Sequence, residues 1–115
     1  MSRFTLPAPS GAHLTSDQLA VLRTMLEQQR AFRVDQLAQL HRPDPGSPLS
    51  APDPEIFDAL VAGARSALRD VQGALWRMDE GRYGRCVRCA EPIGAERLEI
   101  LPQAALCLGC QRAAG

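Results

Sequence analysis

The stretch YGRCVRCAEPIGAERLEILPQAALCLGCQ, residues Tyr83–Gln111, contains all four cysteines of the chain. They form two Cys-x-x-Cys pairs, and the 17 residues 90–106 between the pairs match the spacing of four-cysteine zinc sites. A tetrahedral zinc ion takes two sulfurs from one tight turn and two from another, each at about 2.3 Å. The sequence therefore predicts one structural Zn²⁺ ion with the ligands Cys86, Cys89, Cys107 and Cys110. Four thiolates leave no open position for a reacting water, so we expect no catalysis there.

Three other uses of the cysteines compete with structural zinc. Two disulfides would require an oxidising compartment. The N-terminus lacks an apolar signal segment, and no stretch approaches about 18 uninterrupted apolar residues, so we expect a cytoplasmic protein with no membrane partner. A redox-active pair usually opens a helix of a thioredoxin-like βαβ unit, and the sequence pattern contains no such unit. An iron–sulfur cluster also accepts four cysteines.

N-terminal to this stretch, the pattern predicts a helix that ends near His41. Thr15 or Ser16 supplies the N-cap, and Gln18 completes a capping box with Thr15. Pro43 disfavours helical geometry in the residue before it and so ends the helix. An apolar stripe runs along this helix at three- and four-residue steps: Leu19, Leu22, Leu26, Val34, Leu37 and Leu40.

A second helix is predicted after the proline-rich segment 42–54. Asp53 is a good N-cap, Pro54 suits the first helical position, and Gly81 suits the position just after the helix end. Its apolar stripe consists of Phe57, Leu60, Ala64, Leu68, Val71, Leu75 and Met78.

Neither stripe can be buried by one helix alone, so we expect the two helices to fold back on each other. The predicted fold is all-α dominated: an antiparallel coiled-coil hairpin about 35–40 Å long with a small four-cysteine zinc finger at its base. Residues 1–14 are expected to be a flexible tail, residues 15–80 the hairpin with its tip loop at 42–54, and residues 81–115 the finger. We expect a monomer; a larger bundle completed by self-association is the alternative.

The composition limits the classes of function. The 115 residues include 13 basic and 13 acidic ones, and this balance argues against a polyanion-binding surface spread over the whole protein. No acid–base pair or activated nucleophile is recognisable, so we do not expect an enzyme.

The finger resembles the DksA/TraR zinc-finger family of bacterial RNA polymerase regulators. The matching features lie within residues 79–111: Tyr-Gly-x-Cys-x-x-Cys, an Ile-Gly, Arg97-Leu98, Pro102 and the closing Cys-x-x-Cys. The resemblance implies that the hairpin enters the secondary channel of RNA polymerase and carries acidic residues towards the active site, while the finger stays outside. In this chain the tip candidates are Asp53, Glu55 and Asp58; Glu55 is a weaker candidate, as is Asp44.

Two features depart from the family pattern. The tip sequence DPEIFDA, residues 53–59, has Ile56 where the second aspartate of the family's Asp-x-x-Asp-x-Ala pattern would stand. At the positions where members that respond to the alarmone ppGpp carry basic residues, this chain has Asp70, Leu101 and Gln111. Because ppGpp is strongly anionic, we expect no response through that site.

The leading hypothesis is therefore a transcription regulator that binds bacterial RNA polymerase directly, independently of ppGpp and without sequence-specific DNA contacts. An alternative is a zinc-dependent nucleic-acid-binding module, in which Arg85, Arg88 and Arg97 would contact phosphates; these arginines are also candidate polymerase contacts. A third hypothesis is a protein-interaction module that uses the helix stripes.

Overall fold

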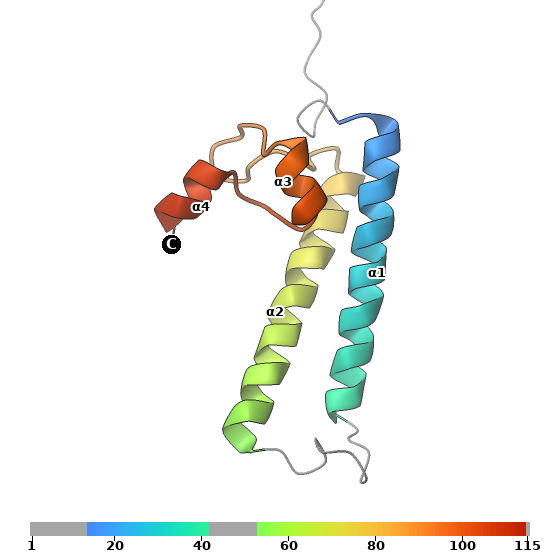
Figure 1. Cartoon of the computed structure of the whole chain (residues 1–115), viewed down its shortest axis with the longest axis vertical. Coiled ribbons are helices and arrows are strands. Elements are labelled where there is room, and N and C mark those ends of the chain that lie inside the picture. The colour runs from blue at the N-terminus through green and yellow to red at the C-terminus, as the bar shows by residue number, and fades with distance from the viewer. Residues whose placement is uncertain (1–13, 42–52, 115) are drawn as a thin grey trace, which may run out of the picture.

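The computed structural model describes residues 14–41 and 53–114 of the chain. Two long helices, α1 (Ser16–His41) and α2 (Pro54–Asp79), run antiparallel beside each other. Two short helices, α3 (Ala95–Ile100) and α4 (Leu108–Ala114), lie at the end of the hairpin where α1 begins and α2 ends (Figure 1). This arrangement confirms the predicted hairpin with a small finger at its base. The tail 1–13 and most of the tip loop, 42–52, lie outside the described residues.

The first helix begins with the predicted capping box. The backbone N–H of Gln18 donates to the Thr15 hydroxyl oxygen at 3.0 Å, and the N–H of Thr15 donates to the Gln18 side-chain oxygen at 2.8 Å. These reciprocal bonds satisfy backbone groups that have no partner inside a helix. The helix continues to His41, two residues before Pro43, as the sequence predicts.

The second helix has local signals at both ends. The Oδ1 atom of Asp53 accepts hydrogen bonds from the backbone N–H groups of Glu55 and Ile56, at 2.8 and 3.4 Å. At the other end Gly81 adopts φ 72°, and the N–H groups of Gly81 and Arg82 bond back into the last turn. This is a Schellman motif, in which a left-handed residue, usually glycine, closes the helix.

The core lies at the finger end of the molecule. The buried residues that pack together there come from both helices and from the finger: Leu14, Leu22, Leu26, Val71, Ala74, Leu75, Tyr83, Cys86, Ile93 and Leu98. Towards the tip, the buried apolar residues of the described part are only Leu40 and Ala64. Packing therefore anchors the hairpin at its base and leaves the distal half thinly covered.

Two members of the predicted apolar stripes are exposed. Val34 is 51% exposed and Leu60 is 38% exposed. Both lie in the distal half, where the two helices separate towards the tip (Figure 1). A residue at stripe spacing is buried only where the partner helix comes close enough to cover it, so the prediction is wrong at these two positions.

The described helices include none that could cross a membrane: no window is both long and apolar enough.

Candidate metal centre

The first cysteine pair lies on a tight loop that folds back on itself. The N–H of Cys86 donates to the carbonyl of Glu91 at 2.8 Å, and the N–H of Ala90 donates to the carbonyl of Cys86 at 2.9 Å. Ala90 adopts φ 66°, a left-handed conformation that is uncommon for residues other than glycine. The turn returns the chain directly after Cys89, so that the sulfurs of Cys86 and Cys89 are presented from one loop.

The second pair opens helix α4. Cys107 precedes its first residue, Leu108, and Cys110 lies in the first turn. The backbone N–H of Cys110 donates to the Sγ atom of Cys107 at 3.4 Å. An N–H directed at sulfur stabilises a thiolate, which is the form that binds metal.

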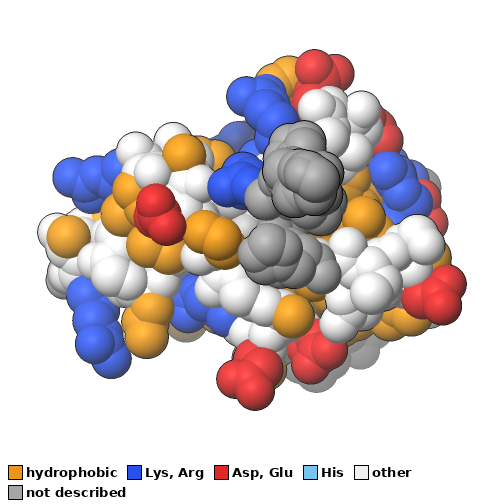
Figure 2. Space-filling model, turned by 90° about the horizontal axis from the view of Figure 1, so that it is seen from above, with side chains coloured by type: hydrophobic (Ala, Val, Ile, Leu, Met, Phe, Trp, Pro, Cys, Tyr) orange, Lys and Arg blue, Asp and Glu red, His pale blue; other side chains and the backbone are white. Residues whose placement is uncertain are grey.

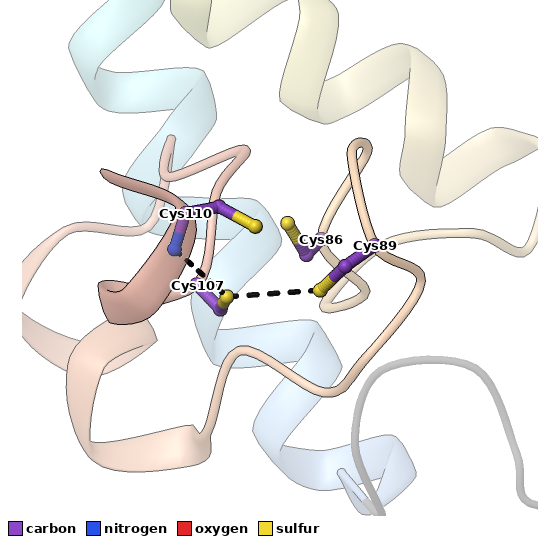
Figure 3. A group of neighbouring side chains, drawn as sticks. All are labelled: Cys86, Cys89, Cys107 and Cys110. Carbon is purple, nitrogen blue, oxygen red and sulfur yellow. Dashed lines mark hydrogen bonds between the residues drawn. The ribbon is translucent and has the colours of Figure 1, made fainter. Parts of the chain in front are cut away.

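The four sulfurs converge on one point (Figure 3). All four Sγ atoms lie within 4.8 Å of one another, and those of Cys89 and Cys107 are 3.8 Å apart. Sulfurs held at about 2.3 Å from a tetrahedral zinc ion lie about 3.8 Å from each other. A disulfide would require about 2.05 Å, and all four cysteines are free. The donor set and its geometry therefore fit one structural zinc ion.

The ionisation of the four-cysteine cluster favours a bound cation. Burial alone would raise the pKa of Cys86, but hydrogen bonds from the backbone at Cys107, Cys89 and Arg88 lower it to about 6. The side chains of Cys107 and Cys86, together with burial, raise the pKa of Cys110 to about 12. The Cys86 thiol thus ionises easily, while the pKa values of Cys89 and Cys110 are raised. A bound divalent cation removes this conflict.

The segment that leads into the second pair is tied down by side chains from three parts of the fold. The Tyr83 hydroxyl donates to the Pro102 carbonyl at 2.8 Å, and Arg77 Nη2 of α2 donates to the Ala104 carbonyl at 3.5 Å. Arg97 Nε of α3 donates to the Leu106 carbonyl at 3.3 Å. The cysteine ligands are thus positioned by contacts that reach back to the hairpin.

The predicted arginine contacts have different surroundings. Arg97 bonds to the carbonyl just before Cys107, and Arg85 bonds through Nη1 to the carbonyl of Ala90, just after Cys89, at 3.0 Å. Both support the cysteine turns. Arg88 is exposed. Sequence reasoning did not single out Arg77, because nothing in the spacing indicates a bond between residues 27 positions apart.

The tip candidates lie at the opposite end from the cysteines. Asp53 caps α2, while Glu55 and Asp58 are exposed in its first turns. Since α2 has 26 residues, about 39 Å of helix separates them from the finger. The structure therefore brings the four cysteines together but not the acidic residues with them. Asp44 lies outside the described residues.

The architecture defines a class: a long antiparallel helical hairpin with a C4 zinc finger at its base. Residues 81–114 match the model of the prokaryotic dksA/traR C4-type zinc finger. This match over the finger confirms the resemblance seen in the sequence.

Individual relatives agree with this assignment. The chain is 36% identical over 47 residues to the RNA polymerase-binding transcription factor DksA of Haemophilus influenzae, covering 41% of this chain and 32% of that protein. It is also 36% identical over 56 residues to an uncharacterized protein of Aquifex aeolicus, covering 49% of this chain and 39% of that protein. The match thus spans only 32% and 39% of the length of these two curated relatives.

The likeness in fold extends further than the likeness in sequence. The structure of transcription factor DksA2 from Pseudomonas aeruginosa superposes with a TM-score of 0.64 at 27% sequence identity. The superposition covers 90% of this chain and 87% of that one, so it includes the hairpin as well as the finger.

Proposed function

We propose that the protein is a transcription regulator that binds bacterial RNA polymerase directly. The observation that carries this proposal is the shared architecture with DksA2, which extends over 90% of the chain at 27% identity. The DksA of Haemophilus influenzae, to which this chain is 36% identical over 47 residues, is named as RNA polymerase-binding. The regulator acts by binding and not by chemistry. Its place of action is the bacterial cytoplasm, and it acts as a monomer.

The hairpin provides the means of reaching the enzyme. Helices α1 and α2 are each about 39 Å long and are held together at the finger end by the core. In the proposed complex the tip enters the secondary channel, and the zinc finger stays outside on the rim. A stiff helix pair can deliver a small acidic group down a narrow pore, which a globular domain cannot enter.

At the tip, Asp53 can cap its helix and still face a partner. Both cap bonds end on Oδ1, and no bond to Oδ2 is found among the described residues. Within the described residues, the second oxygen can therefore approach the polymerase. Glu55 and Asp58 are exposed nearby and supply further negative charge.

We further propose that the regulator works without ppGpp. The three positions that would need basic side chains carry Asp70, Leu101 and Gln111, and all three are exposed. None can form a charge-assisted hydrogen bond with a phosphate oxygen as a donor cation. Labelled ppGpp should not bind the complex with polymerase at this site. Binding that is abolished by changes at these three positions would contradict this part of the proposal.

The nucleic-acid alternative has less support. Arg85 and Arg97 each donate to a backbone carbonyl next to a cysteine ligand. The view onto the finger end shows basic, acidic and hydrophobic side chains interspersed, without a uniform basic face (Figure 2). A phosphate backbone binds where positive charge is concentrated.

A co-purification experiment tests the proposed function. Zinc-loaded protein with an N-terminal tag is expected to retain core RNA polymerase from the cognate bacterium, and the Cys107→Ser variant is expected to retain less. The Arg112→Gln variant, changed on the exposed face of α4, serves as the control. No association of the zinc-loaded wild-type chain with polymerase would refute the proposal.

A further inference from the structure

One flank of α2 carries a row of exposed side chains, four of them polar or charged and one aromatic. Arg65, Arg69, Gln72, Trp76 and Asp79 follow one another at steps of four, three, four and three residues, so they share one helix face. Contacts with α1 locate this row on the molecule. Arg23 of α1 forms an ion pair with Asp79 at 2.8 Å at the finger end. At the tip end, His41 of α1 lies edge-on to Phe57, with ring centroids 6.3 Å apart.

Among the described residues, no carboxylate forms an ion pair with the arginines of this row. Within residues 14–41 and 53–114, Arg23 and Asp79 form the one ion pair within 4.0 Å. Arg65 and Arg69 are both exposed, and four residues of helix place them about 6 Å apart along the axis. Each guanidinium presents a planar fork of N–H donors that matches a carboxylate. The pair therefore offers two adjacent anion-binding forks.

The upper part of the row adds an aromatic anchor. Trp76 is 54% exposed, and the Arg82 guanidinium lies over its ring at 4.6 Å from the centroid. Stacking on the ring holds the Arg82 side chain in one place while leaving much of the indole accessible. Tryptophan and arginine are the residue types that most often carry the binding energy of protein–protein interfaces.

The lower part of the row borders a groove. Apolar side chains of Phe57, Val61 and Ala62 line it together with Arg65 and Arg69, and its volume is about 520 Å³. His41 and Asp58 complete the lining. An apolar lining with basic side chains suits a partner that presents an apolar side chain next to carboxylates.

We propose that Arg65, Arg69, Trp76 and Arg82, called here the arginine flank, form a docking surface for an acidic protein surface with carboxylates spaced to meet the two forks. The inference rests on the proposed function, because RNA polymerase is the protein expected to supply that surface. It concerns the side of the hairpin and not its acidic tip. In this arrangement the flank supplies affinity, and the tip remains free to act.

A protein fits the arginine flank better than a nucleic acid does. Asp58 lines the groove at the lower end, and Asp79 closes the row at the upper end. A continuous phosphate backbone along the flank would meet these carboxylates, whereas a protein surface can place its own carboxylates only opposite the arginines. The apolar lining from Phe57 and Val61 also offers nothing to a sugar–phosphate chain.

The test compares charge variants in a titration with polymerase. N-terminally labelled, zinc-loaded protein is titrated with core RNA polymerase at about 0.1 M salt, and fluorescence anisotropy gives the affinity. The variants are Arg65→Gln/Arg69→Gln, the charge-retaining Arg65→Lys/Arg69→Lys, and the control Arg112→Gln. Because positions 65 and 69 are exposed on a helix, all variants should keep the helical circular dichroism of the wild type.

We expect the double variant Arg65→Gln/Arg69→Gln, the glutamine pair, to bind polymerase at least about tenfold more weakly than the wild type. The double lysine variant should have an intermediate affinity, because it keeps the charge but loses the planar guanidinium donors. The Arg112→Gln control should match the wild type. If the wild type binds and the glutamine pair binds equally well, the arginine flank is refuted and the proposed function stands. If the wild type does not bind polymerase, both the arginine flank and the proposed function are refuted.

A second titration uses a single-stranded oligonucleotide, and the fluorescence of Trp76, the only tryptophan, reports binding. Oligonucleotide binding that is lost in the glutamine pair, with polymerase binding unchanged, would make the flank a nucleic-acid surface and refute the inference.

Discussion

Arg77 near the end of α2 donates a hydrogen bond to the carbonyl of Ala104, and this bond ties the hairpin to the segment that carries Cys107. The guanidinium is half-buried, and burial lowers its pKa below the ordinary value. Its Nε atom is buried without a partner in the described structure. Partial burial is unfavourable for the charge of the Arg77 guanidinium. That the fold nevertheless keeps it there indicates that Arg77 joins α2 to the segment that carries Cys107.

Arg77→Ala should loosen the finger from the hairpin. The Ala104 carbonyl loses its donor, and the free energy of unfolding should fall by about 1–3 kcal/mol. Urea denaturation measures this change, and limited proteolysis should show faster cleavage within residues 101–106. Arg112→Ala is the matched control, since Arg112 is exposed. Equal stability of both variants would show that Arg77 does not hold the segment.

Tyr83→Phe isolates one hydrogen bond. The Tyr83 hydroxyl donates to Pro102, and burial, partly opposed by Arg77, raises its pKa from 10.0 to about 12. The variant leaves a buried carbonyl without a donor and should lose about 1–3 kcal/mol of stability near neutral pH.

The same tyrosine should make stability depend on alkaline pH. The folded state binds the phenol proton more tightly than the unfolded state, so this contribution is complete below pH 10 and is lost as pH rises through about 12. Thermal unfolding of the wild type over this range should show a loss of stability that is smaller in Tyr83→Phe. Identical pH profiles for the two proteins would contradict the raised pKa.

Removal of zinc should affect the finger far more than the hairpin. Chelation, or Cys107→Ser, removes the tie between two loops that share few backbone bonds, among them Val87 N–H to the Ala105 carbonyl at 2.9 Å. Hydrogen exchange should lose protection within residues 84–110, while circular dichroism keeps most of the helical signal of α1 and α2. An apoprotein with full protection in the finger would show that zinc is not structural.

Zinc binding should weaken as the pH falls. The pKa of about 6 for Cys86 and about 12 for Cys110 mean that, near pH 7, the first thiol is largely ionised and the second must release a proton to bind zinc. Calorimetry in buffers of different ionisation enthalpy should therefore show proton release. Chelator competition should show tighter binding at pH about 8 than at pH about 6. Affinity independent of pH would contradict thiolate ligation.

At the tip, Asp53 variants separate capping from charge. Asparagine caps a helix as well as aspartate does, so Asp53→Asn should keep stability while removing the negative charge. Asp53→Ala loses both and should cost about 1 kcal/mol. If the charge acts on polymerase, both variants should lose transcriptional effect in a reconstituted assay. Full activity of Asp53→Asn would assign Asp53 to capping alone.

Local signals in the sequence were sufficient for the two long helices and the zinc ligands, but did not predict the short helices α3 and α4. The Thr15–Gln18 box, the Asp53 cap and Gly81 each act within a few residues, and the chemistry of zinc requires the four cysteines to meet. The exposure of Val34 could not be predicted in this way, because it depends on how far the helices separate. The bond from Arg77 to Ala104 also depends on the docked positions of α2 and the finger, which no local pattern encodes.

The concentration of the core at the finger end gives the hairpin the mechanics of a lever. With a fulcrum at the base and an arm of about 39 Å, a rotation of roughly 10° there would move the tip by about 7 Å. A small repacking around Tyr83 or Arg77 would therefore be magnified into a displacement as large as a side chain. Changes far from the tip should alter where its carboxylates are placed without altering the tip sequence at all.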